Sequence, residues 1–268
     1  QASDFLMWLQ VTGIYRKNSL GNLQIQLPAV VIGGGLTAID TATELQAYYA
    51  VQVEKTLDRY ERLLGKIGEE KIRARFDPNE AVVLDTWLKH GRAIKAEREA
   101  AAREHRPANL NRLVREWGGV TLVYRKRLQD APAYRLNHEE VIKALEEGIF
   151  IADCLNPVEF VPGSDGSVSS VKLERQAVEN GKWRGTGEII EMPARAVMVA
   201  AGTHPNVMYE REYPGTFKMD KWGEFYQGHR LVDDGNAWKL EPVGSGQVGF
   251  FTSYQKDNKL ISFYGDNH

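Results

Sequence analysis

The chain has 268 residues, of which 43% are hydrophobic and 26% are charged, with a formal net charge of −2. These proportions are ordinary for a globular protein with a sizeable core, and they give no reason to expect a nucleic-acid or anionic-membrane partner. No apolar run approaches the ~20 residues that a membrane-spanning helix needs, so a cytoplasmic location is the default expectation. Cys154 is the only cysteine, which excludes a disulfide within the chain and a redox pair of cysteines.

Residues 1–26 precede the first predicted strand. Apolar residues recur at helical spacing within 2–12, which predicts a short helix that ends at Gly13, and residues 14–26 are predicted to form a connector. The chain begins at Gln1 rather than at a methionine, and we therefore expect it to be a piece of a longer polypeptide.

The segment that follows has the order of a dinucleotide-binding unit, namely strand, glycine bend and helix. Residues 27–32 form an apolar run, and a helix is predicted over about 36–50. Gly33 lets the chain turn sharply off the strand, Gly35 allows a close approach of a pyrophosphate, and Ala38 lets the helix pack against the strand. The predicted phosphate-binding residues, called the glycine turn below, are Gly33, Gly34, Gly35, Leu36, Thr37 and Ala38. Two alternatives remain at this point, a turn without a ligand and a methyltransferase-like site.

A charged block over 52–117 is predicted to be a helical insertion. Asp77, Pro78 and Glu80 have the types and spacing of a helix start: a capping residue, a proline at the first position and a glutamate at the third. The composition favours a solvated helical hairpin that covers the edge of the domain, and a docking surface for a partner or second subunit is the alternative.

A second strand is predicted over 120–124, and it ends in Arg125, Lys126 and Arg127. Sites that select NADH place an acidic residue here to accept a hydrogen bond from the ribose 2′-hydroxyl. Three cations and no carboxylate favour NADPH instead, because its 2′-phosphate is attracted to guanidinium and ammonium groups. A solvated basic turn is the alternative, and the same cations argue against a methyltransferase-like site.

The remaining pattern completes an α/β fold. A helix is predicted over 137–147, a third strand over 149–154 and a buried returning strand over 194–201. Between them, turn signals separate three strands of an antiparallel meander, predicted over 158–161, 168–178 and 188–192. The prediction is a Rossmann-like three-layer dinucleotide-binding domain with an antiparallel β-meander and a large helical insertion.

Four landmarks stand in one order along the chain, and together they carry a resemblance. They are the glycine turn, the Tyr124–Arg127 strand end, the segment Ala201–Asn206 and the terminal Tyr264–Asp266. This order resembles the pyridine-nucleotide-binding part of the two-dinucleotide-domain FAD/NAD(P) oxidoreductases, and most of all the small (beta) subunit of glutamate synthase. That subunit has Gly-Gly-Gly-x-Thr-Ala-x-Asp in its turn, and Asp40 matches the final position.

The resemblance implies how two cofactors are held. Arg125, with Lys126 and Arg127 beside it, would bind the NADPH 2′-phosphate, and the glycine turn would bind the pyrophosphate. Gly202 and Asn206 would lie at the crossover between nucleotide and flavin domains, while Gly265 and Asp266 resemble the residues that contact the ribityl-phosphate region of FAD.

The resemblance also implies a domain plan: 1–26 as a connector from a missing flavin domain, 27–206 as the NAD(P)-binding domain, and 207–268 as a return segment. NADPH would pass hydride to FAD, and electrons would go on to a separate acceptor subunit or domain. The sequence has one glycine fingerprint rather than two, so FAD is expected in the parent protein and the isolated chain is expected to be inactive. The insertion is absent from the typical small subunit, which leaves the acceptor open. No catalytic acid, base or metal cluster stands out, and a non-catalytic scaffold with vestigial nucleotide binding is the competing interpretation.

Overall fold

The structure is a computed structural model that falls into two units, residues 1–202 and 203–268, which are described separately. The residues that it describes, with only the backbone from 251 onward, are 1–202, 206–233, 235, 237–244, 247, 249, 251–256 and 259–264. Gly265 and Asp266, which the resemblance places at a flavin, lie outside the described residues.

A four-stranded parallel sheet forms the centre of the first unit, in the order β3-β2-β1-β7. Its strands are β1 (Ala29–Ile32), β2 (Val120–Val123), β3 (Phe150–Ala152) and β7 (Ala196–Val199). The chain winds outward from β1 to β3 and then returns to the opposite side of β1. This reversal is the topological switch point at which α/β sheets bind their ligands.

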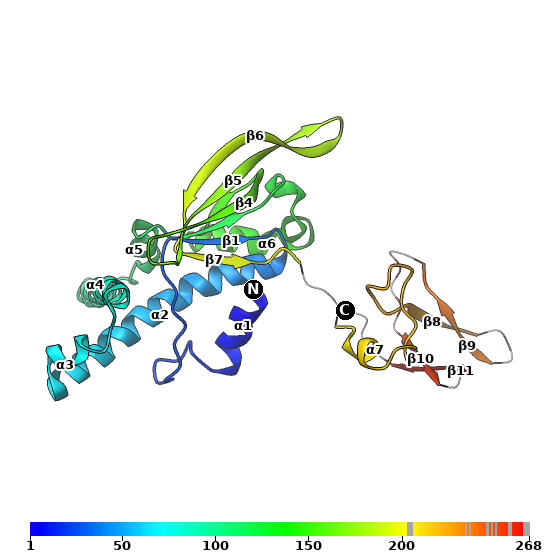
Figure 1. Cartoon of the computed structure of the whole chain (residues 1–268), viewed down its shortest axis with the longest axis horizontal. Coiled ribbons are helices and arrows are strands. Elements are labelled where there is room, and N and C mark those ends of the chain that lie inside the picture. Colours follow the sequence, from blue (N-terminus) through cyan, green and yellow to red (C-terminus); the bar gives the residue numbers. More distant parts are fainter. Residues whose placement is uncertain are drawn as a thin grey trace. The chain divides into compact units, whose positions relative to one another are not determined.

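The alternation of side chains along β1 explains the three layers. Ala29 and Val31 belong to the core that packs against the helices, whereas Val30 and Ile32 belong to the core on the opposite face. Successive side chains of a strand point to opposite faces, so a strand that is apolar throughout needs cover on both. Helices α2 (Leu36–Ile67) and α6 (Pro132–Glu146) supply one cover, and the antiparallel meander described next supplies the other (Figure 1). The predicted fold class is confirmed.

The meander pairs three antiparallel strands in the order β4-β5-β6. They are β4 (Leu155–Pro162), β5 (Val168–Glu179) and β6 (Lys182–Pro193). Val171 and Leu173 on β5 are fully buried towards the parallel sheet, whereas Lys172 between them pairs with Glu159 at 2.8 Å. The predicted meander is therefore present, with longer strands than the turn signals indicate.

Six α-helices and one 3₁₀ turn belong to the first unit. They are α1 (Ala2–Val11), α2 (Leu36–Ile67), α3 (Glu69–Arg73), α4 (Pro78–Arg103), α5 (Leu110–Glu116), the 3₁₀ turn Leu128–Asp130 and α6 (Pro132–Glu146). One predicted boundary is wrong. The helix expected to end near Ala50 continues to Ile67, because α4 packs along its second half. The helix predicted to begin at Asn137 is present, because Asn137 has non-helical φ −154° and ψ 75°, but α6 also includes a short helical segment ahead of this kink, from Pro132, that the sequence did not indicate.

The α2–α4 crossing is the core of the predicted insertion. Gly91 on α4 faces α2, where a Cβ would lie 2.7 Å from the carbonyl oxygen of Val53. Ion pairs flank this close approach, including Arg98 with Glu54 at 2.6 Å. At its start, α4 has the capping box predicted at Asp77: the carboxylate accepts from the amides of the second and third helical residues, and the third residue, Glu80, accepts from the amide of Asp77. The α2–α4 pair is therefore packed, and its second helix begins at the residue that the sequence indicates.

A stripe of polar side chains on α2 holds the connector 14–26 by its backbone. Gln52 bonds both the amide and the carbonyl of Ile25, at 2.8 Å each. Lys55, which is buried, donates to the carbonyls of Ile14 and Gly21 at 2.9 Å each. The α2 side chains that bond the connector are Tyr48, Gln52, Lys55 and Arg59. Their spacing places them on one helical face, so α2 fixes the backbone of the connector, which forms turns over residues 14–18 and does not belong to a sheet.

The second unit holds a four-stranded antiparallel sheet in the order β11-β10-β8-β9. Its elements are α7 (Met208–Glu212), β8 (Gly228–Asp233), β9 (Trp238–Pro242), β10 (Phe251–Lys256) and β11 (Lys259–Tyr264). Within the described residues, none of the helices combines the length and the apolar composition that crossing a membrane requires.

Candidate nucleotide-binding site

The glycine turn lies at the carboxyl ends of two neighbouring strands. The amide of Gly33, directly after β1, donates to the carbonyl of Val123 on β2 at 3.0 Å. On the other side, the amide of Ala200, directly after β7, donates to the carbonyl of Ile32 at 2.7 Å. The turn therefore begins at the switch point of the sheet, where the fold is expected to bind a ligand.

The three glycines of the turn meet different surroundings. Gly33 has φ +154°, and a Cβ there would lie 2.9 Å from the carbonyl carbon of Ala200 and 3.1 Å from the Cβ of Ala38. A Cβ at Gly34 would lie 2.8 Å from Cζ of Tyr124, so the tyrosine ring covers this residue. A Cβ at Gly35 would meet no atom within 4 Å. Gly33 and Gly34 are needed for packing, whereas Gly35 adjoins open space.

The open space lies at the start of α2. Gly35 is its N-cap, with extended φ −92° and ψ 175°, and its carbonyl accepts from the amide of Ala38 at 3.0 Å. Ala38 is fully buried, as its predicted packing role requires, while Thr37 is half-buried and Leu36 is exposed. The first amides of a helix have no acceptor within it, and the helix dipole adds partial positive charge there. The arrangement can bind an anion such as a pyrophosphate.

The second part of the candidate site is the basic strand end, defined here as residues 125–127, which follows β2. Arg125 is exposed and has no ion pair among the described residues, and Lys126 is half-buried. Arg127 differs, because its Nε donates to Oδ2 of Asp130 at 2.9 Å. Tyr124, directly after β2, joins the two parts of the site by lying over Gly34.

The sequence analysis predicted a strand end with three cations and no carboxylate. It missed two carboxylates nearby, those of Asp130 and Asp153. Asp130 pairs with Arg127, and the hydrogen bond from that arginine, followed by the nearby charges of Arg135 and Lys126, lowers the pKa of Asp130. Asp153, which follows β3, accepts a hydrogen bond from the amide of Leu128 at 2.9 Å and so holds the 3₁₀ turn. Asp130 lies only three residues after Arg127, and this spacing was the available signal.

The remaining predicted site residues are less closely tied to the turn. Gly202, with φ +125°, follows two residues after Ala200, whose backbone covers Gly33. Asn206 lies in the other unit, where its Oδ1 accepts from the amide of Met208 at 3.1 Å. Their roles at a domain crossover stay predictions.

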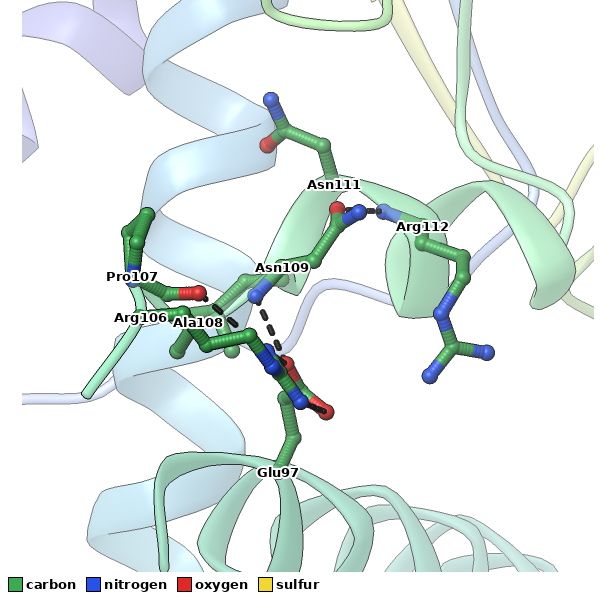
Figure 2. A pocket seen from close by; sticks show the side chains of 8 residues that line it. Glu97, Arg106, Pro107, Ala108, Asn109, Asn111 and Arg112 are labelled. Carbon is green, nitrogen blue, oxygen red and sulfur yellow. Dashed lines mark hydrogen bonds and ion pairs between the residues drawn. The ribbon is translucent and has the colours of Figure 1, made fainter. Parts of the chain in front are cut away.

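Two hollows lie away from the glycine turn and the basic strand end. One, of about 740 Å³, lies between the connector, α2 and α4, and includes the ion pair between Glu54 and Arg98. The other, of about 660 Å³, lies at the turn between α4 and α5, where Glu97 accepts from Arg106 at 2.6 Å and from the amide of Asn109 at 2.8 Å (Figure 2). Hydrogen bonds from Arg106 and then from Asn109 lower the pKa of Glu97 to about 2. Each hollow contains an internal ion pair, Glu54 with Arg98 in one and Glu97 with Arg106 in the other, and neither includes a predicted nucleotide-binding residue.

The chain has similarity to curated protein sequences and to solved structures. No protein-family model matches it. It is 37% identical over 172 residues to the uncharacterized protein RP006 of Rickettsia prowazekii (strain Madrid E), a match that covers 64% of this chain and 22% of that protein. The chain thus spans less than a quarter of this relative, whose name carries no function.

The solved structures are distant. FprA of Mycobacterium tuberculosis, an oxidoreductase solved in complex with NADPH, is 16% identical with a TM-score of 0.41 over 84% of this chain and 48% of its own. Thioredoxin reductase of Lactococcus lactis is 16% identical with a TM-score of 0.36, over 78% and 40%. A ferredoxin reductase of Rhodopseudomonas palustris is 12% identical with a TM-score of 0.33, over 72% and 27%. The strand order of the chain itself, rather than these similarities, defines its fold.

Proposed function

We propose that this chain is the NADPH-binding part of a flavin-dependent oxidoreductase similar to the small subunit of glutamate synthase. NADPH would lie across the carboxyl ends of the parallel strands, with its pyrophosphate on the glycine turn and its 2′-phosphate on the basic strand end. The bound nucleotide supplies a hydride. The chain's own residues bind and orient it, and no side chain of the chain is assigned as an acid or base.

The observation that carries the proposal is the open space at Gly35. Gly33 and Gly34 are each covered by protein atoms, and packing within the chain explains why they are glycines. Gly35 meets no atom within 4 Å and has backbone angles that other residues adopt, so packing does not explain it. A ligand that needs this space explains it, and the start of α2 favours an anionic one.

Arg125 supports the choice of NADPH. The residue is exposed, follows the strand adjacent to β1, and has no ion pair among the described residues. A guanidinium in this position suits a 2′-phosphate, which accepts two parallel hydrogen bonds, better than it suits a ribose hydroxyl.

The proposal assigns the flavin to another part of the polypeptide. Among the described residues, the glycine turn is the only connection from a strand to a helix that contains a run of glycines. The proposal assigns this turn to NADPH. Hydride would pass to FAD held there, and the final electron acceptor would be a further domain or subunit. On this view, the chain alone binds NADPH but does not turn over.

A titration of the full chain with NADPH and NADH, followed by nicotinamide fluorescence, tests the proposal. Arg125→Ala is expected to weaken NADPH binding by about 10- to 100-fold and to change NADH binding little, because a hydrogen bond to a charged group contributes about 1.5–3 kcal/mol. Arg62→Ala is the matched control, since Arg62 is an exposed arginine on α2 that pairs with Asp58 at 2.9 Å.

Two results would contradict the proposal. Equal losses for both nucleotides would reject the 2′-phosphate assignment. Absence of NADPH binding by the unaltered chain would favour the competing function, a scaffold in which the helical insertion recruits a partner and nucleotide binding is vestigial.

A further inference from the structure

The basic strand end contains its own counter-anion. The carboxylate of Asp130 accepts two hydrogen bonds from Arg127, one from Nε at 2.9 Å and one from Nη2 at 3.4 Å. Asp130 is the less exposed partner, with 31% of its side chain accessible against 62% for Arg127. Two further cations, Arg135 and Lys126, act on the same carboxylate. Asp130 therefore pairs with one of the cations proposed to bind a phosphate, and two further cations contribute to its electrostatic surroundings.

The pair is positioned by the fold rather than by the two side chains alone. Asp130 ends the 3₁₀ turn Leu128–Asp130, and Asp153 fixes the start of this turn through the amide of Leu128. Immediately afterwards, the amide of Ala133 donates to the carbonyl of Gly34 at 2.9 Å, which ties the same segment to the glycine turn. The carboxylate is thus held close to both halves of the candidate site.

We propose that Asp130 is a specificity-determining residue that holds Arg127 in an internal pair and competes with the nucleotide 2′-phosphate for it. The inference rests on the proposed function and refines it. In the free chain Asp130 neutralises Arg127, and NADPH must displace this carboxylate from the guanidinium to use it. The competition lowers the affinity for NADPH, while a nucleotide without the 2′-phosphate does not experience it.

The test compares the unaltered chain with Asp130→Asn, Arg127→Gln and the double variant. Each is titrated with NADPH, NADH and adenosine 2′-monophosphate at low ionic strength, where charge screening is weak. Asp130→Asn is expected to tighten NADPH binding about twofold to fivefold, the range of an exposed charge pair, and to leave NADH binding unchanged. The gain is expected to shrink when Arg127 is already glutamine, because the shared partner is then absent.

Asp58→Asn is the matched control. Asp58 also pairs with an arginine on its own segment, at 2.9 Å, but it lies in the second half of α2. Its substitution is expected to change the affinity for none of the three ligands, which separates a local effect of Asp130 from a change in net charge.

Several outcomes overturn the inference. NADPH binding that is unchanged or weaker in Asp130→Asn contradicts the competition, and an equal gain with and without Arg127 contradicts the shared arginine. Weaker NADH binding in Asp130→Asn would mean that the carboxylate accepts a ribose hydroxyl. If adenosine 2′-monophosphate follows the expected pattern but NADPH does not bind, the inference holds and the proposed function fails. If none of the ligands binds any variant, both fail.

Discussion

The α2–α4 crossing and the glycine turn both depend on glycine residues, and they differ in what surrounds the position that a Cβ atom would occupy. At the α2–α4 crossing, Gly91 is surrounded by protein atoms of the facing helix, and no room is left. In the glycine turn, Gly33 is covered in the same way, whereas Gly35 is open. The difference shows that a glycine can serve packing or ligand approach, and that the neighbouring atoms reveal which.

The largest effect on stability is expected at Gly33. In Gly33→Ala the added methyl group meets the carbonyl of Ala200, and the residue must keep φ +154°. A strained backbone and overpacking each cost about 1–3 kcal/mol, so we expect a loss of about 2–6 kcal/mol in the free energy of unfolding. Urea denaturation measures it. A loss below about 1 kcal/mol would show that the two strand ends are not closely packed here.

The second largest effect on stability is expected from acid pH, through His90 at the α2–α4 crossing. His90, beside Gly91, is buried, stacks on Trp117 with ring centroids 3.8 Å apart, and lies 2.7 Å from the hydroxyl of Tyr49 through Nδ1. Burial, with a smaller contribution from the charge of Lys89, lowers the pKa of His90 to about 4. Burial raises the pKa of Tyr49, so the phenol donates and the neutral imidazole accepts.

The sign of the pH dependence follows from this lowered pKa. The unfolded chain binds a proton near pH 6.5 and the folded chain near pH 4, so the stabilisation from His90 is complete above about pH 6.5 and is lost as the pH falls towards 4. The loss is roughly 3 kcal/mol in total. Urea midpoints of the unaltered chain and His90→Gln across this window measure it, and parallel curves would contradict the prediction.

A smaller effect is expected from Gly91→Ala. The methyl group would lie 2.7 Å from the backbone oxygen of Val53, so the helices must separate, although alanine favours a helix by about 1 kcal/mol over glycine. We expect a net loss of about 1–2 kcal/mol. Gly65→Ala is the matched control, because Gly65 lies in α2 with no atom near its Cβ position, and there alanine is expected to stabilise. Equal effects of the two substitutions would mean that the crossing is loose.

The smallest effect on stability, and the sharpest on binding, is expected from Gly35→Ala. The position is an open N-cap with ordinary backbone angles, so stability should fall by only about 0.5–1 kcal/mol, because alanine is a poorer N-cap than glycine. The methyl group occupies the space proposed for the pyrophosphate, and NADPH binding should weaken by at least about tenfold. Thermal unfolding and the NADPH titration measure the two effects. Unchanged binding would show that the open space has another cause.

Much of the fold was predictable because its signals are local. The apolar run before Gly33 predicts a buried strand and the turn signals after Pro157 predict the meander, and both are present. The capping box at Asp77 was also predictable, since its two hydrogen bonds join residues three apart. Helix lengths were not predictable in this way, because α2 extends past Ala50 only where α4 covers it.

The sequence by itself determined which residues form the glycine turn and which cations follow β2, because backbone freedom and charge are properties of single residues and short spacings. Only the tertiary structure decided that Gly33 is packed and Gly35 is open. The atoms that cover Gly33 come from Ala200, which follows β7, a strand far away in the sequence but paired with β1 in the sheet. It also decided that Asp153 holds the turn containing Asp130, a contact between residues far apart in the chain. Contacts of this kind depend on how whole layers pack, and no short pattern records them.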